Sequence, residues 1–329
     1  MSAEKLNRAI KKFCAENQLI FSEELSSSLP KRWEKHGDMI MLPQACFNPE
    51  LWNSLDQSKL WDLVADTLKV KRLARQTIIT DDGYRTPKVV MLKGTSTTVT
   101  HIDNKIKYKF DVTKCMFSSG NITEKIRMSK LSCKDETIVD MFAGIGYFTL
   151  PLLVHGKAKY VYACEWNPNA AKALKENLII NKVSERCTVH QGDNREVCPT
   201  DIADRIILGL IPSAAASYKT ACQALNQLEG GVMHIHGNVS SHANSVFPTP
   251  KETLHISSNE TTCNKILKQQ WMDWAIFTAT QLLSILNICK DSGFKSQWSI
   301  NILHIERVKS YAPHIDHIVI DLRCHPVAI

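Results

Sequence analysis

The sequence has few glycines and prolines and no closely paired cysteines, the residues that are typical of fibrous, disordered or disulfide-rich chains. Its 329 residues include only 13 glycines and 12 prolines, which excludes a collagen-like or low-complexity protein. Eleven cysteines are present, but the number is odd and no Cys-x-x-Cys pair occurs. Zinc ribbons and thioredoxin-like sites need that spacing, so neither is predicted. We expect free thiols in a reducing compartment.

The chain also lacks an apolar leader and a long hydrophobic run. Residues 1–8 are charged, unlike a secretory signal. The longest apolar stretch, 274–289, carries polar side chains and is shorter than the roughly 20 residues that cross a bilayer. We therefore expect a cytoplasmic protein that does not contact a membrane.

The remaining composition is that of a folded protein. Hydrophobic residues make up 44% and charged residues 22% of the chain, and the length suggests two domains. Lysine and arginine number 40 against 33 acidic residues, a net charge of +7. This charge favours a polyanionic partner such as nucleic acid, and the mildly basic surface of an ordinary enzyme is the alternative.

Pattern changes along the chain predict three segments. The first segment, 1–28, is predicted to be an amphipathic helix over 1–20 followed by a polar link around 22–29. The second, 29–130, is predicted to be a small α+β module that contains a β-hairpin. Residues 131–329 alternate strands with helices, including a helix over 213–228, which predicts an α/β, doubly wound, Rossmann-like parallel sheet. The last two strands have no helix between them and predict an antiparallel edge.

The first strand–helix turn of this larger segment has the features of a nucleotide-binding loop. Asp140 ends the strand, Phe142 follows, and Gly144 and Gly146 form a Gly-x-Gly, which lets a ligand approach the backbone closely. A dinucleotide site needs a third glycine where this chain has Thr149, so NAD is disfavoured.

Polar residues also end the next two strands. Glu165 is placed to accept hydrogen bonds from ribose hydroxyls, and Asp193 and Asn194 are placed to bind an adenine edge. Because the carboxyl ends of neighbouring parallel strands share one crevice, the three sites together predict an adenosine cofactor, and S-adenosylmethionine (AdoMet) fits best.

At residues 140–148, 163–168 and 192–195 the sequence resembles a tRNA-modifying family. This family holds the tRNA guanine-N1 methyltransferases and the wybutosine-pathway aminocarboxypropyl transferases, whose catalytic domain is a class I AdoMet-dependent fold. The resemblance covers about residues 30–325. Family members often carry a larger amino-terminal domain, so we expect that part to be reduced here.

Three segments resemble the transferase branch: 116–125, 208–213 and 234–238. The resemblance implies transfer of the 3-amino-3-carboxypropyl group of AdoMet to C7 of 4-demethylwyosine, beside the anticodon of phenylalanine tRNA. The alternatives are a tRNA guanine-N1 methyltransferase and a non-catalytic tRNA-binding adapter. Base methyltransferases usually have an asparagine or aspartate after the fourth strand, and 209–213 here has neither, which argues against methylation.

The residues that match the family's cofactor-binding positions are Ser118, Lys125, Glu165, Asp193 and Asn194. Lys125 suits the methionine carboxylate because it places a compact charge on a long stem. No general base is identified and no metal site is predicted. His234 and His236 alternate on a strand and share one face, with a structural or loop-ordering role as the main interpretation.

A lysine-rich run precedes the cofactor strand and is a candidate for tRNA phosphate contacts. It comprises Lys105, Lys107, Lys109, Lys114, Lys125, Arg127 and Lys130, with a cluster at 69–75 ahead of it. The alternative is that these lysines form a solvated strand face.

Overall fold

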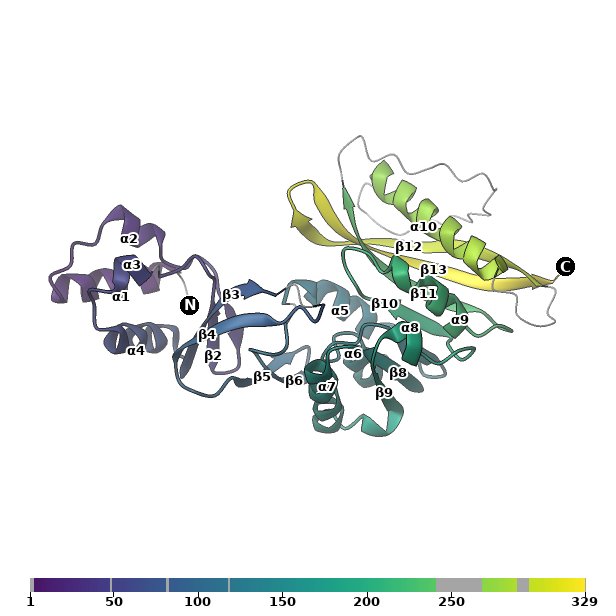
Figure 1. The fold of residues 1–329 in the computed structure, drawn as a ribbon, viewed down its shortest axis with the longest axis horizontal. Coiled ribbons are helices and arrows are strands. Elements are labelled where there is room, and N and C mark those ends of the chain that lie inside the picture. The colour runs from purple at the N-terminus through teal and green to yellow at the C-terminus, as the bar shows by residue number, and fades with distance from the viewer. Residues whose placement is uncertain are drawn as a thin grey trace. The chain divides into compact units, whose positions relative to one another are not determined.

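The computed structural model describes residues 3–47, 49–80, 83–117, 119–240, 268–288 and 296–328. The chain forms two compact units, Met1–Ser119 and Gly120–Ile329. In Figure 1 the first unit runs from purple to blue and the second from blue-green to yellow. No described sheet is shared between the two units, and the predicted cofactor strands all belong to the second.

The helices of the first unit cover an apolar cluster. They are α1 (Ala3–Glu16), α2 (Glu23–Ser27), α3 (Pro49–Trp52) and α4 (Gln57–Leu68). Leu6, Ile10 and Cys14 lie on one buried face of α1, which packs against α4. The expectation that 22–29 is only a polar link is wrong, because the Ser22 hydroxyl accepts a hydrogen bond from the Leu25 N–H and caps α2.

Two sheets complete the first unit. The larger has the order β1-β2-β3-β4, with β1 (Glu34–His36), β2 (Met39–Leu42), β3 (Arg72–Ile79) and β4 (Pro87–Lys93). The second is the predicted hairpin of β5 (Thr98–Asp103) and β6 (Ile106–Asp111). Its turn residues Asn104 and Lys105 have φ of +46° and +64°, the conformation of the preferred two-residue hairpin turns.

The second unit contains a seven-stranded sheet in the order β12-β13-β11-β10-β7-β8-β9. The strands are β7 (Thr137–Asp140), β8 (Tyr160–Glu165), β9 (Cys187–Gln191), β10 (Arg205–Leu208), β11 (Gly231–Ser240), β12 (Ser296–Ala312) and β13 (Ile315–Ala328). Pairing among β7 to β11 is parallel, and β13 is antiparallel to both β11 and β12. The predicted doubly wound sheet and its antiparallel edge are confirmed.

Helices cover both faces of this sheet (Figure 1). They are α5 (Ile122–Ser129), α6 (Thr149–Val154), α7 (Pro168–Ile180), α8 (Asn194–Val197), α9 (Tyr218–Ala224) and α10 (Gln269–Ile288). Met233 and Ile235 of β11 belong to the apolar core that α9 and α10 cover. Successive side chains of a strand point to opposite faces, so His234 and His236 face the other side, where α5 and α6 lie.

The helix predicted over 213–228 is wrong in its length. A short 3-10 turn (Ala215–Ser217) leads into α9, and Leu225 is already extended, with φ −57° and ψ 141°. Backbone N–H groups of Ile202 and Ala203 donate to the Ala224 carbonyl. These long-range bonds end the helix, which a helical pattern cannot anticipate. Helix α10 contains most of the apolar stretch 274–289 and begins before it, at Gln269.

Candidate active site

The Gly-x-Gly turn after β7 adopts a backbone that only glycine accommodates easily. Gly144 has φ of +57° and Gly146 has φ of +105°, and L residues are strained in that region. A Cβ on Gly146 would lie 2.8 Å from Cγ of Leu150. The side-chain amide of Asn177 donates to the Ile145 carbonyl over 3.0 Å and holds the loop from α7.

Asp140, the last residue of β7, holds this turn through its side chain. Its side chain is fully buried, and Oδ2 accepts a 2.7 Å hydrogen bond from the Thr149 hydroxyl. The backbone N–H of Phe142 lies 3.4 Å from Oδ1. Burial raises the pKa of Asp140 to about 6, because a charged carboxylate is poorly solvated there. These contacts order the loop.

Glu165 ties the end of β8 to the glycine turn. Its Oε2 accepts a 2.6 Å bond from the Gly144 N–H, and Oε1 accepts a 2.7 Å bond from the Asn167 N–H. Burial raises its pKa. Each carboxylate oxygen has a second lone pair, so two further donors, such as the hydroxyls of a ribose, can still be accepted.

Asp193 and Asn194 follow β9 but differ in their surroundings. Asp193 caps α8 and forms an ion pair with Arg195, which lowers its pKa. Asn194 is 7% exposed; its amide donates to the Met141 carbonyl over 3.0 Å and accepts from the Ser217 hydroxyl over 2.8 Å. The amide therefore links the end of β9 to the residue after β7 and to the 3-10 turn before α9, and Asp193 presents the more accessible polar group.

Helix α5 buries charged residues of the 116–125 segment. Glu124 is 1% exposed and Lys125 is 3% exposed. Ser118, the other predicted cofactor residue of this segment, lies outside the described residues. The expectation that the lysine-rich run contacts phosphates does not fit Lys125 and Arg127. Lys125 is buried, and Arg127 forms ion pairs with Glu124 and Asp321. Lys105, Lys107 and Lys109 are exposed on the hairpin of the first unit.

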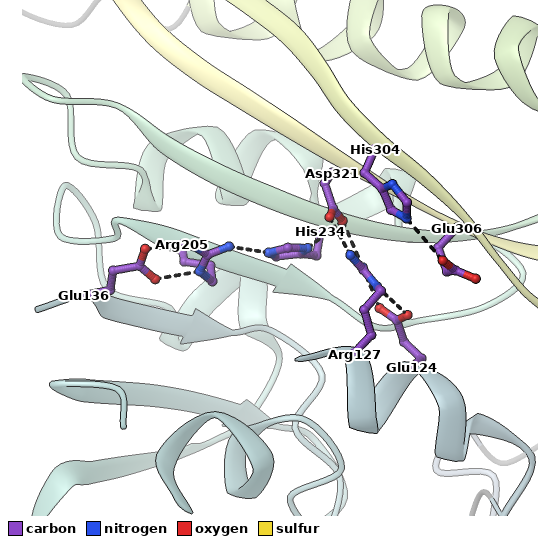
Figure 2. Close-up of polar contacts among 8 residues, drawn as sticks. All are labelled: Glu124, Arg127, Glu136, Arg205, His234, His304, Glu306 and Asp321. Atoms are coloured by element: carbon purple, nitrogen blue, oxygen red, sulfur yellow. Dashed lines mark hydrogen bonds and ion pairs between the residues drawn. The ribbon is translucent and has the colours of Figure 1, made fainter. Parts of the chain in front are cut away.

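An ion-pair network that sequence reasoning missed anchors α5 to the sheet (Figure 2). Arg127 contacts both Glu124 and Asp321, and Asp321 in turn lies 2.6 Å from Nδ1 of His234. The other ring nitrogen of His234 lies 2.6 Å from a guanidinium nitrogen of Arg205.

Arg205 ends this network in a bidentate pair with Glu136, at 2.6 and 2.7 Å. Burial alone would raise the pKa of Asp321, but His234 and Arg127 hold it well below its usual value. The sequence signal was the pair of opposite charges Glu124 and Arg127, at i and i+3 on α5; only Arg127 was considered, as one of the candidate phosphate contacts.

Contacts within the second unit link α5, which carries the end of the first transferase-like segment, to the other two segments. Arg127, just after the first, bonds to Asp321, which holds His234 of the third. The Asn238 N–H of the third donates to the Pro212 carbonyl of the second over 2.9 Å. The Ser213 hydroxyl accepts from the Ala215 N–H, a local turn contact.

In the described part of the chain, no group of three or more His, Cys, Asp or Glu side chains could hold a metal ion. Among the same residues, no helix combines the length and the apolar character needed to cross a bilayer.

Comparison with known proteins agrees with this geometry. Residues 98–266 match the TRM5/TYW2 methyltransferase domain, and residues 17–97 match the TYW2 N-terminal domain. The tRNA wybutosine-synthesizing protein 2 homolog of Danio rerio is 50% identical over 98% of this chain and 78% of its own length.

Solved structures show the same fold. Pyrococcus horikoshii TYW2 in complex with MeSAdo is 30% identical, with a TM-score of 0.70 over 97% of this chain and 99% of that one. M. jannaschii TYW2 in complex with AdoMet is 26% identical, with a TM-score of 0.59 over 90% of this chain and 100% of that one. The chain belongs to the TRM5/TYW2 family, among the tRNA wybutosine-synthesizing protein 2 homologues.

Proposed function

We propose that this protein is an AdoMet-dependent transferase of tRNA wybutosine synthesis. It transfers the 3-amino-3-carboxypropyl group to C7 of 4-demethylwyosine, beside the anticodon of phenylalanine tRNA. The observation that carries the proposal is the linkage of α5, the 234–238 strand segment and the 209–213 slot through the Arg127–Asp321–His234 contacts and the Asn238 N–H bond to the Pro212 carbonyl. The named relatives support the pathway, and these segments support the group transferred.

The cofactor-binding roles follow from the chemistry of each side chain. Gly144 and Gly146 let the adenosine approach the backbone. Glu165 accepts from the ribose hydroxyls, and Asp193 accepts from the adenine edge. Asp140, Phe142 and Asn194 hold the loop and the strand ends in register.

Two further residues bind the methionine end of AdoMet. Lys125 and Ser118 bind the methionine carboxylate, a role for which the burial of Lys125 removes competing water.

The reaction needs positioning more than acid–base chemistry. C7 of the acceptor forms a bond to the γ-carbon of the methionine arm while the γ-carbon–sulfur bond breaks. The bonding pair stays on sulfur, so the product is neutral 5′-methylthioadenosine. C7 then releases its proton to solvent, which restores the aromatic ring. Residues 209–213 supply no amide or carboxylate to hold a guanine N1 proton, which supports carbon transfer over methylation.

The partner in this proposal is tRNA, and its specific site is the anticodon region of phenylalanine tRNA. Three lysines of the hairpin in the first unit, Lys105 in its turn and Lys107 and Lys109 on β6, suit phosphate contacts because they are exposed. The cysteines that the structure describes are all free thiols, which supports the cytoplasmic location that we retain in this proposal.

Product analysis tests the proposal. The protein is incubated with AdoMet and tRNA that contains 4-demethylwyosine, and the nucleosides and the small products are identified by mass spectrometry. We expect 5′-methylthioadenosine together with a tRNA nucleoside that has gained the aminocarboxypropyl group. Formation of S-adenosylhomocysteine would instead identify a methyltransferase. Binding of tRNA without either product would identify an adapter.

A further inference from the structure

Two cysteine side chains meet beside the strand ends that carry Glu165 and Asp193. Cys164 is the residue before Glu165 on β8, and Cys198 directly follows α8, the helix that Asp193 caps. Helix α8 packs against β8, and the two thiols are hydrogen-bonded to each other. The sulfur atoms of hydrogen-bonded thiols are in contact, so the pair meets the first geometric requirement for a disulfide.

The two thiols differ in their access to solvent. Among the described cysteines, only Cys187 and Cys198 are partly exposed, and Cys164 is completely buried. The hydrogen bond that Cys164 donates lowers the pKa of Cys198. The same hydrogen bond, together with burial, raises the pKa of Cys164. An accessible thiolate is the form of cysteine that oxidants attack, so Cys198 is the thiol that reacts first and Cys164 is the one positioned to react with it.

Backbone hydrogen bonds connect both cysteines to the candidate cofactor site. The Cys164 carbonyl accepts a 3.0 Å bond from the Ala143 N–H of the glycine turn. The Cys198 N–H donates to the Asn194 carbonyl over 3.1 Å at the end of α8. A change in the spacing of the two sulfur atoms is therefore transmitted to the glycine turn and to the helix that begins beside Asp193.

We propose that Cys198 and Cys164 form a reversible disulfide when the protein encounters hydrogen peroxide, and that this disulfide weakens AdoMet binding, an effect that rests on the proposed function. The Cys198 thiolate attacks one peroxide oxygen, the O–O bond breaks, and the other oxygen leaves as water after protonation. Cys198 is then a sulfenic acid. The Cys164 sulfur attacks the sulfenic sulfur and displaces its hydroxyl, which leaves as water with the Cys164 proton. Two thiols are oxidised and one peroxide is reduced to two water molecules.

The effect on binding follows from the length of the new bond. A disulfide bond is much shorter than the contact between two hydrogen-bonded thiols. Its formation draws β8 and α8 together and displaces Glu165, which is adjacent to Cys164, from the position in which it accepts from the ribose. Thiol reductants reverse the reaction by exchange, as is typical of disulfides that act as redox sensors in a reducing compartment.

Peptide mapping of the full chain tests the chemistry. Reduced protein is treated with hydrogen peroxide, alkylated, and digested without reduction by trypsin, which cleaves after lysine and arginine. Cys164 then lies in peptide 160–172 and Cys198 in peptide 196–205, and each peptide contains a single cysteine. We expect mass spectrometry to find the two peptides joined after peroxide treatment and separate after dithiothreitol.

Three variants assign the roles of the thiols. In Cys164→Ala, the sulfenic acid at Cys198 persists and is captured by dimedone. In Cys198→Ser, Cys164 stays reduced. Cys187→Ser is the matched control, because Cys187 is also partly exposed but its sulfur lies 3.9 Å from the Thr188 carbonyl oxygen instead. This control should form the same joined peptides as the unmodified protein. Thermal unfolding checks each variant, and if Cys164→Ala does not fold, Cys198→Ser carries the test.

Calorimetry with S-adenosylhomocysteine, after the peroxide has been removed, tests the effect on binding. We expect oxidation to weaken binding about tenfold or more in the unmodified protein and in Cys187→Ser, because a hydrogen bond to the ligand is lost. Dithiothreitol should restore the affinity. Cys198→Ser should bind the ligand equally well before and after peroxide treatment.

Absence of the joined peptides in the unmodified protein would overturn the inference, and joined peptides with unchanged affinity would overturn the effect on binding. An equal loss of affinity in Cys198→Ser would assign that effect to another group and overturn it as well. If the reduced, unmodified protein does not bind S-adenosylhomocysteine, the proposed function fails and the effect on binding with it, while the peptide map still decides whether the two cysteines form a disulfide.

Discussion

Arg127 on α5 and Asp321 on β13 form a two-point ion pair, with Nη1–Oδ2 at 2.6 Å and Nη2–Oδ1 at 3.0 Å. The two residues are 194 positions apart in the chain. The pair is mostly buried, since the Asp321 side chain is 9% exposed. It fixes the helix that carries Lys125 to the antiparallel edge of the sheet (Figure 2).

Removing the charge of Asp321 should destabilise the protein strongly. Asp321→Asn leaves Arg127 with fewer compensating contacts in a buried site, and breaking such a pair costs about 3–5 kcal/mol. Urea unfolding measures the change. Glu306→Gln is the matched control, because its contact with His304 is partly exposed and should be worth below about 1 kcal/mol. Equal effects of the two substitutions would contradict this role for the network.

The same pair predicts an acid-sensitive contribution to stability. The folded state lowers the pKa of Asp321, so its stabilisation is present above the unfolded value of about 4 and decreases as the pH falls below it. Urea unfolding of the unmodified protein between about pH 5 and pH 2.5 should show this loss. Asp321→Asn should show a shallower dependence on pH over that range, and parallel curves would argue against the assignment.

Asp140 should show the opposite behaviour. Its folded pKa of about 6 exceeds the unfolded value of about 4, so the folded protein binds a proton more tightly between them. Stability therefore falls as the pH rises through this interval, by up to about 3 kcal/mol. Asp140→Asn should remove that cost. We expect the variant to be more stable than the unmodified protein at pH 8 and similar to it near pH 4, in chemical denaturation. A variant that is less stable at pH 8 would refute this account.

Glu165→Ala should weaken AdoMet binding by about 1–3 kcal/mol, because the ribose loses a partly buried acceptor. The Gly144 and Asn167 N–H groups also lose their partner. Isothermal titration calorimetry measures the affinity, and Glu229→Ala, an exposed loop change, is the control. An affinity equal to that of the unmodified protein would rule out the ribose assignment.

Lys125→Met should raise the KM for AdoMet about tenfold or more, since a charge-assisted hydrogen bond to the carboxylate is lost. The affinity for 5′-methylthioadenosine, which has no carboxylate, should not change. Lys130→Met removes an exposed lysine one residue beyond the same helix and should leave both values unchanged. If Lys125→Met weakens both ligands alike, Lys125 supports the fold of α5 and does not bind the arm.

The sequence by itself determined the local elements and the edge of the sheet where the site lies. The glycine turn, Glu165 and Asp193 follow or end β7, β8 and β9 as predicted, because strand–helix alternation brings the carboxyl ends of parallel strands together; their roles toward the cofactor stay a prediction. The 98–111 hairpin was also predictable, since its turn and its alternation involve only neighbouring residues.

Only the tertiary structure decided which polar side chains meet across the sheet. The register of β11 and β13 pairs His234 with Asp321 and Asn238 with His317. The same register turns Arg127, which the pattern assigned to the surface, into an anchor for α5. Periodicity specifies which face of an element is buried, but contacts between elements far apart in the chain depend on strand register and packing, which no short stretch of sequence encodes.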